Sequence, residues 1–265
     1  MAPPPWLSAS SRSRWDDGAV IRLRPLRSLF HAQGGWFSAN WHFSFDQYHD
    51  PDWMGLGALR VFNDDRLVPG GVWPMHPHRD VEGITYVAEG EFEHADSVGN
   101  DGVLHPGGVQ RMTLGRGAEH SERNHSKAEP MRFVQLWIIP ARRGLEPDVE
   151  QREFPAEERQ NRLRPVLVPA EGYAGPGAPA ADDAVRVHQD ASLYAGLLDP
   201  AVSVTQRLRD RFGGYLFVVH GGATLSRAGE MEEGSAAVLQ DEPEFIVRAG
   251  PRGAELLFVE VPLAP

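Results

Sequence analysis

The amino-acid sequence predicts an all-β protein built from two tandem jelly-roll β-barrels. Short runs rich in β-branched and aromatic residues recur along the chain, and Gly, Pro or Asp turns separate them. Helical patterns are few, and regularly spaced short strands are typical of sandwiches and jelly rolls. The chain has 265 residues with 41% hydrophobic content, which is enough for one large or two medium cores.

The first half of the chain is expected to form one domain, residues 20–150, after a disordered extension, residues 1–19. Residues 82–89 form a β-branched and aromatic run that ends at a glycine turn, and together with residues 91–94 they predict a hairpin. Residues 132–139 are strongly apolar and predict a further strand of the same domain.

The second half is expected to form another β-domain, residues 151–265. An Arg- and Glu-rich stretch, residues 141–159, is interpreted as the crossing between the domains. Residues 170–183 are rich in Gly, Pro and Ala and predict a mobile surface loop. The strands expected in this domain are residues 163–168, 185–188, 202–206, 214–220, 236–239, 245–247 and 255–261.

Two short polar pairs in the first domain predict a metal site. They are His76 with His78 and, 44 residues after His76, His120 with Glu122. Residues i and i+2 of a strand lie on one face, so four ligands need only two strands. The chain has no cysteine, so a metal here must be held by nitrogen and oxygen. The spacing therefore predicts His76, His78, His120 and Glu122 as the ligands.

The surroundings of both pairs resemble the cupin signature. Gly70 and His76-x-His78 are similar to the first cupin motif, and Gly117-x-x-His120-x-x-x-Asn124 is similar to the second. In the commoner cupin spacing a glutamate stands where this chain has Gly83. Glu82 comes one residue early, and in a regular strand it would face away from the histidines.

The same shift is found in the pirin family, which the chain resembles along nearly its whole length. Pirins take their carboxylate ligand from the second motif, here Glu122. The segments that carry the resemblance are residues 41–45, 58–65, 76–80, 94–100 and 115–122. The His-Arg-Asp-Val-Glu stretch, residues 78–82, is similar to the bacterial branch, in which quercetin 2,3-dioxygenase activity is known. The resemblance implies a bicupin fold with one metal, held by the first barrel.

The donor set leaves the identity of the metal open. Resemblance favours Fe²⁺, whereas the general affinity order favours Cu²⁺, Ni²⁺ or Zn²⁺, and Mn²⁺ and Co²⁺ also accept nitrogen and oxygen ligands. Zn²⁺ would make the site structural or hydrolytic, and the redox metals could support oxygen chemistry.

Other polar residues receive simpler interpretations. Glu82, Arg79 and Asp80 are expected in surface or strand-terminal ion pairs, with support of the metal ligands as the alternative. Asp64 and Asp65 are expected in a turn. Five histidines outside the two pairs are expected at the surface or in ordinary hydrogen bonds; they are His94, His105, His125, His188 and His220.

Composition excludes several classes of partner. The net charge is −11 and no block of Lys or Arg occurs, which argues against direct nucleic-acid binding. No apolar run reaches the ~18 residues that a membrane helix needs. The first residues lack the apolar centre of a secretory signal, so a cytoplasmic protein is expected. A monomer is also expected, because two barrels already pack together in one chain.

Two functional hypotheses of different classes follow from the resemblance. In the first, the protein cleaves a flavonol such as quercetin with O₂ and releases carbon monoxide, and Glu122 takes the proton of the 3-hydroxyl group as a general base. In the second, the protein is a metal-dependent, redox-responsive regulator that binds a protein partner. A bicupin acting on an unassigned small substrate is a third alternative.

Overall fold

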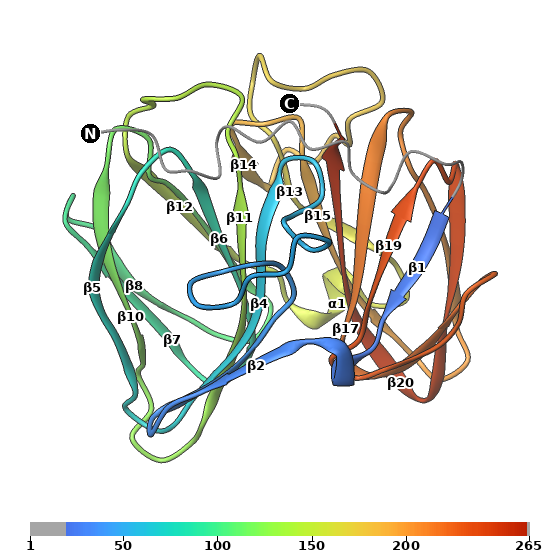
Figure 1. Ribbon diagram of the computed structural model, residues 1–265, viewed down its shortest axis with the longest axis horizontal. Coiled ribbons are helices and arrows are strands. Elements are labelled where there is room, and N and C mark those ends of the chain that lie inside the picture. The colour runs from blue at the N-terminus through green and yellow to red at the C-terminus, as the bar shows by residue number, and fades with distance from the viewer. Residues whose placement is uncertain (1–19, 264–265) are drawn as a thin grey trace.

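Strands dominate the part of the chain that the computed structural model describes, residues 20–263 (Figure 1). The extension expected at residues 1–19 lies outside the described residues. The all-β expectation is confirmed. Only four residues form the helix α1, Ala156–Arg159, and none of the described helices could span a membrane.

Two sheets form the N-terminal half. Seven strands make the first, in the order β12-β9-β6-β11-β4-β3-β2, and four make the second, in the order β5-β10-β7-β8. The bounds of these strands are β2 Phe30–Gln33, β3 Phe37–Trp41, β4 Leu59–Leu67, β5 Val72–His78, β6 Glu82–Glu89, β7 Phe92–Asp96, β8 Asp101–Leu104, β9 Gly108–Thr113, β10 Ala118–Asn124, β11 Met131–Ile138 and β12 Asp148–Glu153.

The C-terminal half is a nine-stranded sheet in the order β1-β19-β17-β20-β15-β13-β14, with β16 on β20 and β18 on β17. A 3₁₀ turn, Leu26–Ser28, follows β1. The bounds of the strands are β1 Val20–Arg24, β13 Arg164–Pro169, β14 Val185–Val187, β15 Ser192–Leu198, β16 Ser203–Arg207, β17 Phe212–Leu225, β18 Gly229–Glu232, β19 Ala236–Gln240 and β20 Glu244–Pro262. Residues 170–183 contain no strand or helix and lie between β13 and β14.

The seven-stranded sheet lies in the middle of the molecule (Figure 1). One of its faces packs on the C-terminal sheet, where Phe62 and Tyr86 meet Tyr215 and Phe217 in the largest buried cluster. Its other face looks toward the four-stranded sheet, and Phe133 packs there against buried residues of β6 and β7. The interior of the N-terminal barrel thus lies between the seven- and four-stranded sheets.

Strand pairing crosses the expected domain boundary at one end. Strand β1 pairs with β19 over five residues and so belongs to the C-terminal sheet, while β12 extends the N-terminal sheet as far as Glu153. Because β1 finds its partner more than 200 residues away, no local pattern could assign it. The expected division of the chain between residues 150 and 151 stays a prediction. Strand β1 lies in the sheet of the other half, and β12 continues past that division.

Two local predictions were wrong. Residues 82–89 do form β6, but β6 pairs with β9 and β11, whereas β7 pairs with β8 and β10. The turn at Gly90, with φ +79°, therefore links two different sheets instead of closing a hairpin. Asp64 and Asp65 do not form a turn either, because both lie buried in β4.

Candidate metal centre

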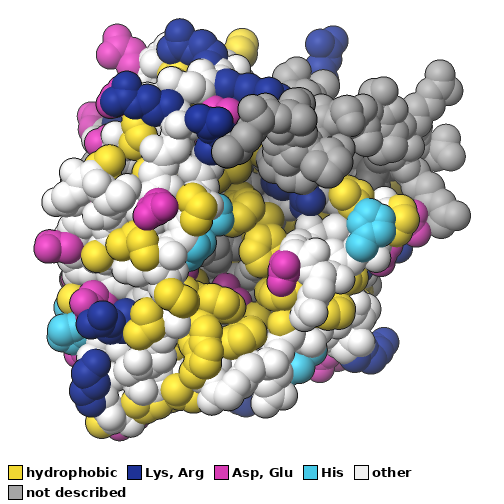
Figure 2. Space-filling view, turned by 60° about the vertical axis from the view of Figure 1, so that its left-hand side comes forward, with side chains coloured by type: hydrophobic (Ala, Val, Ile, Leu, Met, Phe, Trp, Pro, Cys, Tyr) yellow, Lys and Arg dark blue, Asp and Glu magenta, His cyan; other side chains and the backbone are white. Residues whose placement is uncertain are grey.

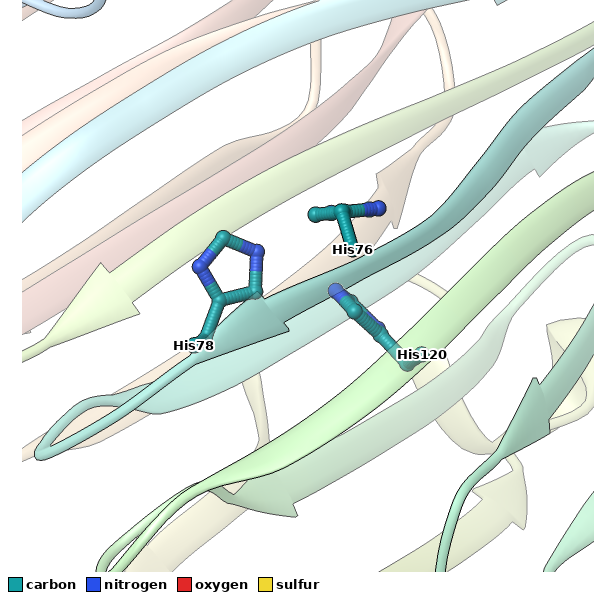
Figure 3. Close-up of side chains that lie close together, drawn as sticks. All are labelled: His76, His78 and His120. Atoms are coloured by element: carbon teal, nitrogen blue, oxygen red, sulfur yellow. The ribbon is translucent and has the colours of Figure 1, made fainter.

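Strands β5 and β10 bring three imidazoles together inside the N-terminal barrel (Figure 3). His76 and His120 are directly opposite each other in the antiparallel pairing, and His78 lies two residues further along β5. The ring centroids of His76 and His120 are 4.5 Å apart, and those of His76 and His78 are 4.7 Å apart. One ring nitrogen from each of the three lies within 4.8 Å of the others. The spacing of a metal-binding group is therefore present.

In two of the rings, the surroundings leave one nitrogen whose lone pair is free to bind a metal. Nδ1 of His76 is 2.7 Å from the carbonyl oxygen of Pro74, so it donates a hydrogen bond there and Nε2 carries the free lone pair. Nε2 of His120 is buried without a hydrogen-bond partner among the described residues. Such an orphaned nitrogen inside a barrel is satisfied when it coordinates a cation.

Burial keeps two of the imidazoles neutral. Burial and, to a smaller extent, the neighbouring imidazoles lower the pKa of His78 to about 4 and the pKa of His120 to about 2. A neutral imidazole is the form that binds a metal, since a protonated ring has no lone pair to offer. Near neutral pH His78 and His120 therefore need not lose a proton before they bind a metal.

Glu122, the fourth predicted ligand, lies beside this group and not within it. Its Oε1 atom is 4.0 Å from Nδ1 of His120 and accepts a hydrogen bond of 2.7 Å from Nε2 of Gln135. The pairing of β10 with β5 has a register shift between His120 and Glu122. As a result, the pairing partner of Glu122 on β5 is Trp73. Burial raises the pKa of Glu122 to about 8. A carboxyl group with such a pKa can accept or release a proton near neutrality.

A second buried carboxyl group, Asp65, lies close to Glu122. Burial raises its pKa well above the usual value, and the charges of Glu122 and Asp64 raise it further. Two carboxylates that share a dry interior disfavour each other's ionised form. Asp65 was expected in a turn, so its place beside Glu122 was not predicted.

The position of His94 beside the candidate metal centre was also not predicted. It lies on β7 opposite Glu122, and its ring centroid is 5.8 Å from that of His120. Its Nε2 is 3.2 Å from a carboxylate oxygen of Asp96, and its Nδ1 is buried without a partner among the described residues. His94-x-Asp96 has the same i, i+2 spacing as the predicted ligand pairs, and this signal could have placed both residues on the face of β7 that looks into the barrel.

The remaining polar residues lie away from the three imidazoles. Glu82 does face away from them, as expected, but it is fully buried between the two halves, where its Oε2 accepts a hydrogen bond of 3.1 Å from Thr113 and lies 3.4 Å from His188. Glu82 begins β6 and pairs with Arg111 at 3.9 Å, so the expected strand-terminal ion pair is present, but it is buried because the C-terminal half covers it. Arg79 is exposed and donates to the carbonyl oxygen of Arg116, and Asp80 accepts from the backbone of Gly144.

The other histidines take hydrogen-bonded or partly exposed positions, as expected. His105 and His125 are exposed and pair with Glu153 and Glu93. His220, at the junction of the halves, lies 3.4 Å from Glu89 and 3.8 Å from Glu255.

Aromatic side chains line one side of the imidazole group. Trp137 meets His78 edge to face at 4.6 Å, and Phe45 meets Trp137 at 5.3 Å. Histidine and hydrophobic side chains gather around a hollow on the face shown in Figure 2. Two shallow cavities of about 480 and 380 Å³ lie elsewhere, along β17, β18 and β20 of the C-terminal half.

Comparisons with known proteins agree with this geometry. The family model named Pirin matches residues 23–138, and the model for the quercetinase C-terminal cupin domain matches residues 177–261. An Escherichia coli K12 protein named quercetin 2,3-dioxygenase is 38% identical over 90% of this chain and 98% of its own. A Caulobacter vibrioides pirin-like protein is 34% identical over 91% of this chain and 99% of its own.

Solved structures give the same result. The crystal structure of YhhW from Escherichia coli has a TM-score of 0.82 and 34% identity, over 93% of this chain and 100% of that one. The nickel(II) complex of this bacterial pirin has a TM-score of 0.81 and covers 92% of this chain and 99% of that one. The expected bicupin fold and the resemblance are therefore confirmed, and the chain belongs to the pirin family.

Proposed function

We propose that this protein is a metal-dependent dioxygenase that cleaves flavonols such as quercetin with O₂ and releases carbon monoxide. The observation that carries the proposal is the joint presence of three converging imidazoles and, beside them, a buried carboxyl group with a raised pKa. A strongly perturbed carboxyl group beside a metal-binding group indicates chemistry and not only structure. Relatives that bear the name quercetin 2,3-dioxygenase support the same reaction class.

The residues fit one divalent first-row metal. His76, His78 and His120 would hold it through their ring nitrogens, and Glu122 would complete the set through its carboxylate. Held by these residues, a divalent metal would supply Lewis acidity, which lowers the pKa of a substrate hydroxyl. Fe²⁺ is the first choice, and the nickel complex of YhhW supports Ni²⁺ as another; Mn²⁺, Co²⁺, Cu²⁺ and Zn²⁺ share the donor preference.

Glu122 would accept the proton of the 3-hydroxyl group. Its raised pKa matches a group that takes up a proton near neutral pH. Trp137 and Phe45 would offer an apolar wall to the flat rings of the substrate, because aromatic faces and edges pack favourably on one another.

The decisive experiment is reconstitution of the metal-free protein. The protein is loaded separately with Fe²⁺, Ni²⁺, Mn²⁺, Co²⁺, Cu²⁺ and Zn²⁺, and loss of quercetin and release of carbon monoxide are measured. We expect turnover with at least one redox metal and none in the His120→Ala variant, which removes a central ligand. Carbon monoxide in proportion to the quercetin consumed identifies ring cleavage as opposed to simple oxidation.

The opposite result also has a definite meaning. Tight stoichiometric metal binding without turnover of quercetin by any form would reject the flavonol dioxygenase. It would favour the regulatory alternative, in which the metal state changes the affinity for a protein partner, or a different small substrate.

A further inference from the structure

Polar side chains form one continuous row across the seven-stranded sheet, on the face that lines the barrel interior. Neighbouring strands place Asn63, Gln135, Thr85 and Gln110 at paired positions, in the order β4, β11, β6 and β9. All four are buried. Uncharged hydrogen-bonding groups in an interior are expensive unless they are satisfied or used. The row faces the four-stranded sheet that carries the imidazoles and Glu122.

Gln135 is the member of the row that reaches the candidate metal centre. Its Nε2 atom donates to Oε1 of Glu122 at 2.7 Å and to Oγ1 of Thr85 at 3.3 Å. An amide nitrogen has two hydrogens and no lone pair to share, so it can serve both acceptors at once. When Glu122 is ionised, as it must be to bind a metal, the reverse orientation would set the amide oxygen against the carboxylate. The two contacts therefore fix the direction of the Gln135 amide.

We propose that Gln135 is a positioning residue that holds the Glu122 carboxylate in its working orientation, with Thr85 as the anchor of the Gln135 amide. The inference rests on the proposed function, since it assigns the support of the group that would bind the metal and accept the proton. Glu122 has several rotatable bonds, and a hydrogen bond to one named oxygen removes alternative orientations. Misplacement of a reacting group by about 1 Å can cost a factor of about 100 in rate.

The row supplies a matched control. Gln110 is buried like Gln135 and lies two strands away on the same face, but its amide donates to Gln151 at 3.0 Å and not to Glu122. Gln135→Leu and Gln110→Leu remove the same chemical group from the same barrel interior. Only the first variant removes a partner of Glu122, so a general effect on folding would affect both.

The test combines metal binding with kinetics. Affinity for Ni²⁺ is measured by competition with a chelator, and the visible absorption spectrum is recorded with Co²⁺, because that spectrum reports the ligand geometry. We expect Gln135→Leu to lower Ni²⁺ affinity about 10-fold or more and to change the Co²⁺ spectrum, as loss of a supporting hydrogen bond does in other metal sites. It should lower kcat of quercetin turnover more than it changes KM. Thr85→Val should act in the same direction but less, and Gln110→Leu should leave all three readouts unchanged.

A double variant separates positioning from other effects. In the Glu122→Ala background, which has no side-chain acceptor for Gln135, Gln135→Leu should have no further effect on Ni²⁺ affinity, because residues that act through one contact are not additive. Equal losses in Gln135→Leu and Gln110→Leu, or additive losses in the double variant, would overturn the proposal. If the parent protein turns over no quercetin, the proposed reaction is rejected, but Ni²⁺ affinity and the Co²⁺ spectrum still test the role of Gln135. A change in these two measurements that occurs in Gln135→Leu and not in Gln110→Leu would support that role.

Discussion

At the scale of the single residue, the two roles proposed for Glu122, metal ligand and general base, compete with each other. As a ligand it must be ionised, and as a general base it must take up a proton, yet burial raises its pKa to about 8 and favours the neutral form. A cation nearby favours the ionised form. The balance between burial and the metal therefore sets the protonation state of this side chain.

The substitution Glu122→Gln, which replaces one carboxylate oxygen by an amide nitrogen, separates the ligand role from the base role. Glu122→Gln keeps the shape and an oxygen that can accept from Gln135, but it removes the basic carboxylate. We expect the variant to retain most of the bound metal, because three imidazoles remain, and to lose turnover by about 100-fold or more, the usual contribution of a general base. Metal content by mass spectrometry and quercetin consumption measure the two effects separately.

The control for this variant lies on the same strand. Glu119 is exposed on the opposite face of β10, so Glu119→Gln removes one carboxylate without touching the site. It should behave as the parent protein. Full activity of Glu122→Gln would exclude the proposed base role.

Residue spacing predicts the imidazole group well and its supports poorly. His76-x-His78 and His120 follow from the two-residue period of a strand, which local sequence determines. The position of Glu122 depends on a register shift between β10 and β5, and its contact with Gln135 depends on the packing of two sheets. Such contacts arise from tertiary structure, and no short pattern encodes them.

At the scale of the element, β4 shows how packing overrides local preference. Adjacent aspartates are rare in strands, which is why residues 64 and 65 predict a turn. In the fold, Arg132 on β11 donates to both carboxylate oxygens of Asp64, at 2.7 and 3.0 Å. Arg132 also donates to the carbonyl oxygen of Val219 in β17, so the ion pair joins the two halves. A charged residue in this strand is stable because its partner is buried with it.

This ion pair gives a prediction about stability. Asp64→Ala leaves the buried guanidinium of Arg132 without its principal partner, and an uncompensated buried charge costs about 3–5 kcal/mol. We expect the free energy of unfolding in urea to fall by that amount. The control is Glu146→Ala, which breaks the exposed pair with Arg116 and should change stability little. A small loss in both variants would mean that Arg132 finds compensation elsewhere, for example from Glu233.

At the scale of the whole molecule, the two halves share one core. The largest buried cluster runs from β4 and β6 of the N-terminal half to β17 and β20 of the C-terminal half, and β1 ties the start of the described chain to the C-terminal sheet. The sequence predicts two β-domains because each has its own strand pattern. It does not predict how they join, because the pairing of β1 and the burial of the shared faces are long-range properties.

His42 reports on this shared core. It is fully buried against Phe62 and Phe217, and its Nδ1 lies 2.7 Å from the hydroxyl group of Tyr215 in β17. Burial lowers the pKa of His42 to about 3, from a usual value of 6.5. Between these values the unfolded chain binds a proton that the folded chain excludes, so stability is lost as the pH falls below 6.5.

The contribution of His42 can be isolated by substitution. His42→Gln retains a group that can hydrogen-bond Tyr215 but cannot titrate. We expect the slope of unfolding free energy against pH between 4 and 6 to be smaller than in the parent protein by about 1.4 kcal/mol per pH unit, the value for one proton. His78 and His120 keep their own contribution in both proteins, so only the difference is assigned to His42.

Tyr215→Phe should lower stability but keep the slope, because His42 remains buried and titratable. If His42→Gln and the parent protein lose stability in parallel as the pH falls, His42 binds its proton as readily in the folded protein as in the unfolded chain, and the shared core does not exclude it.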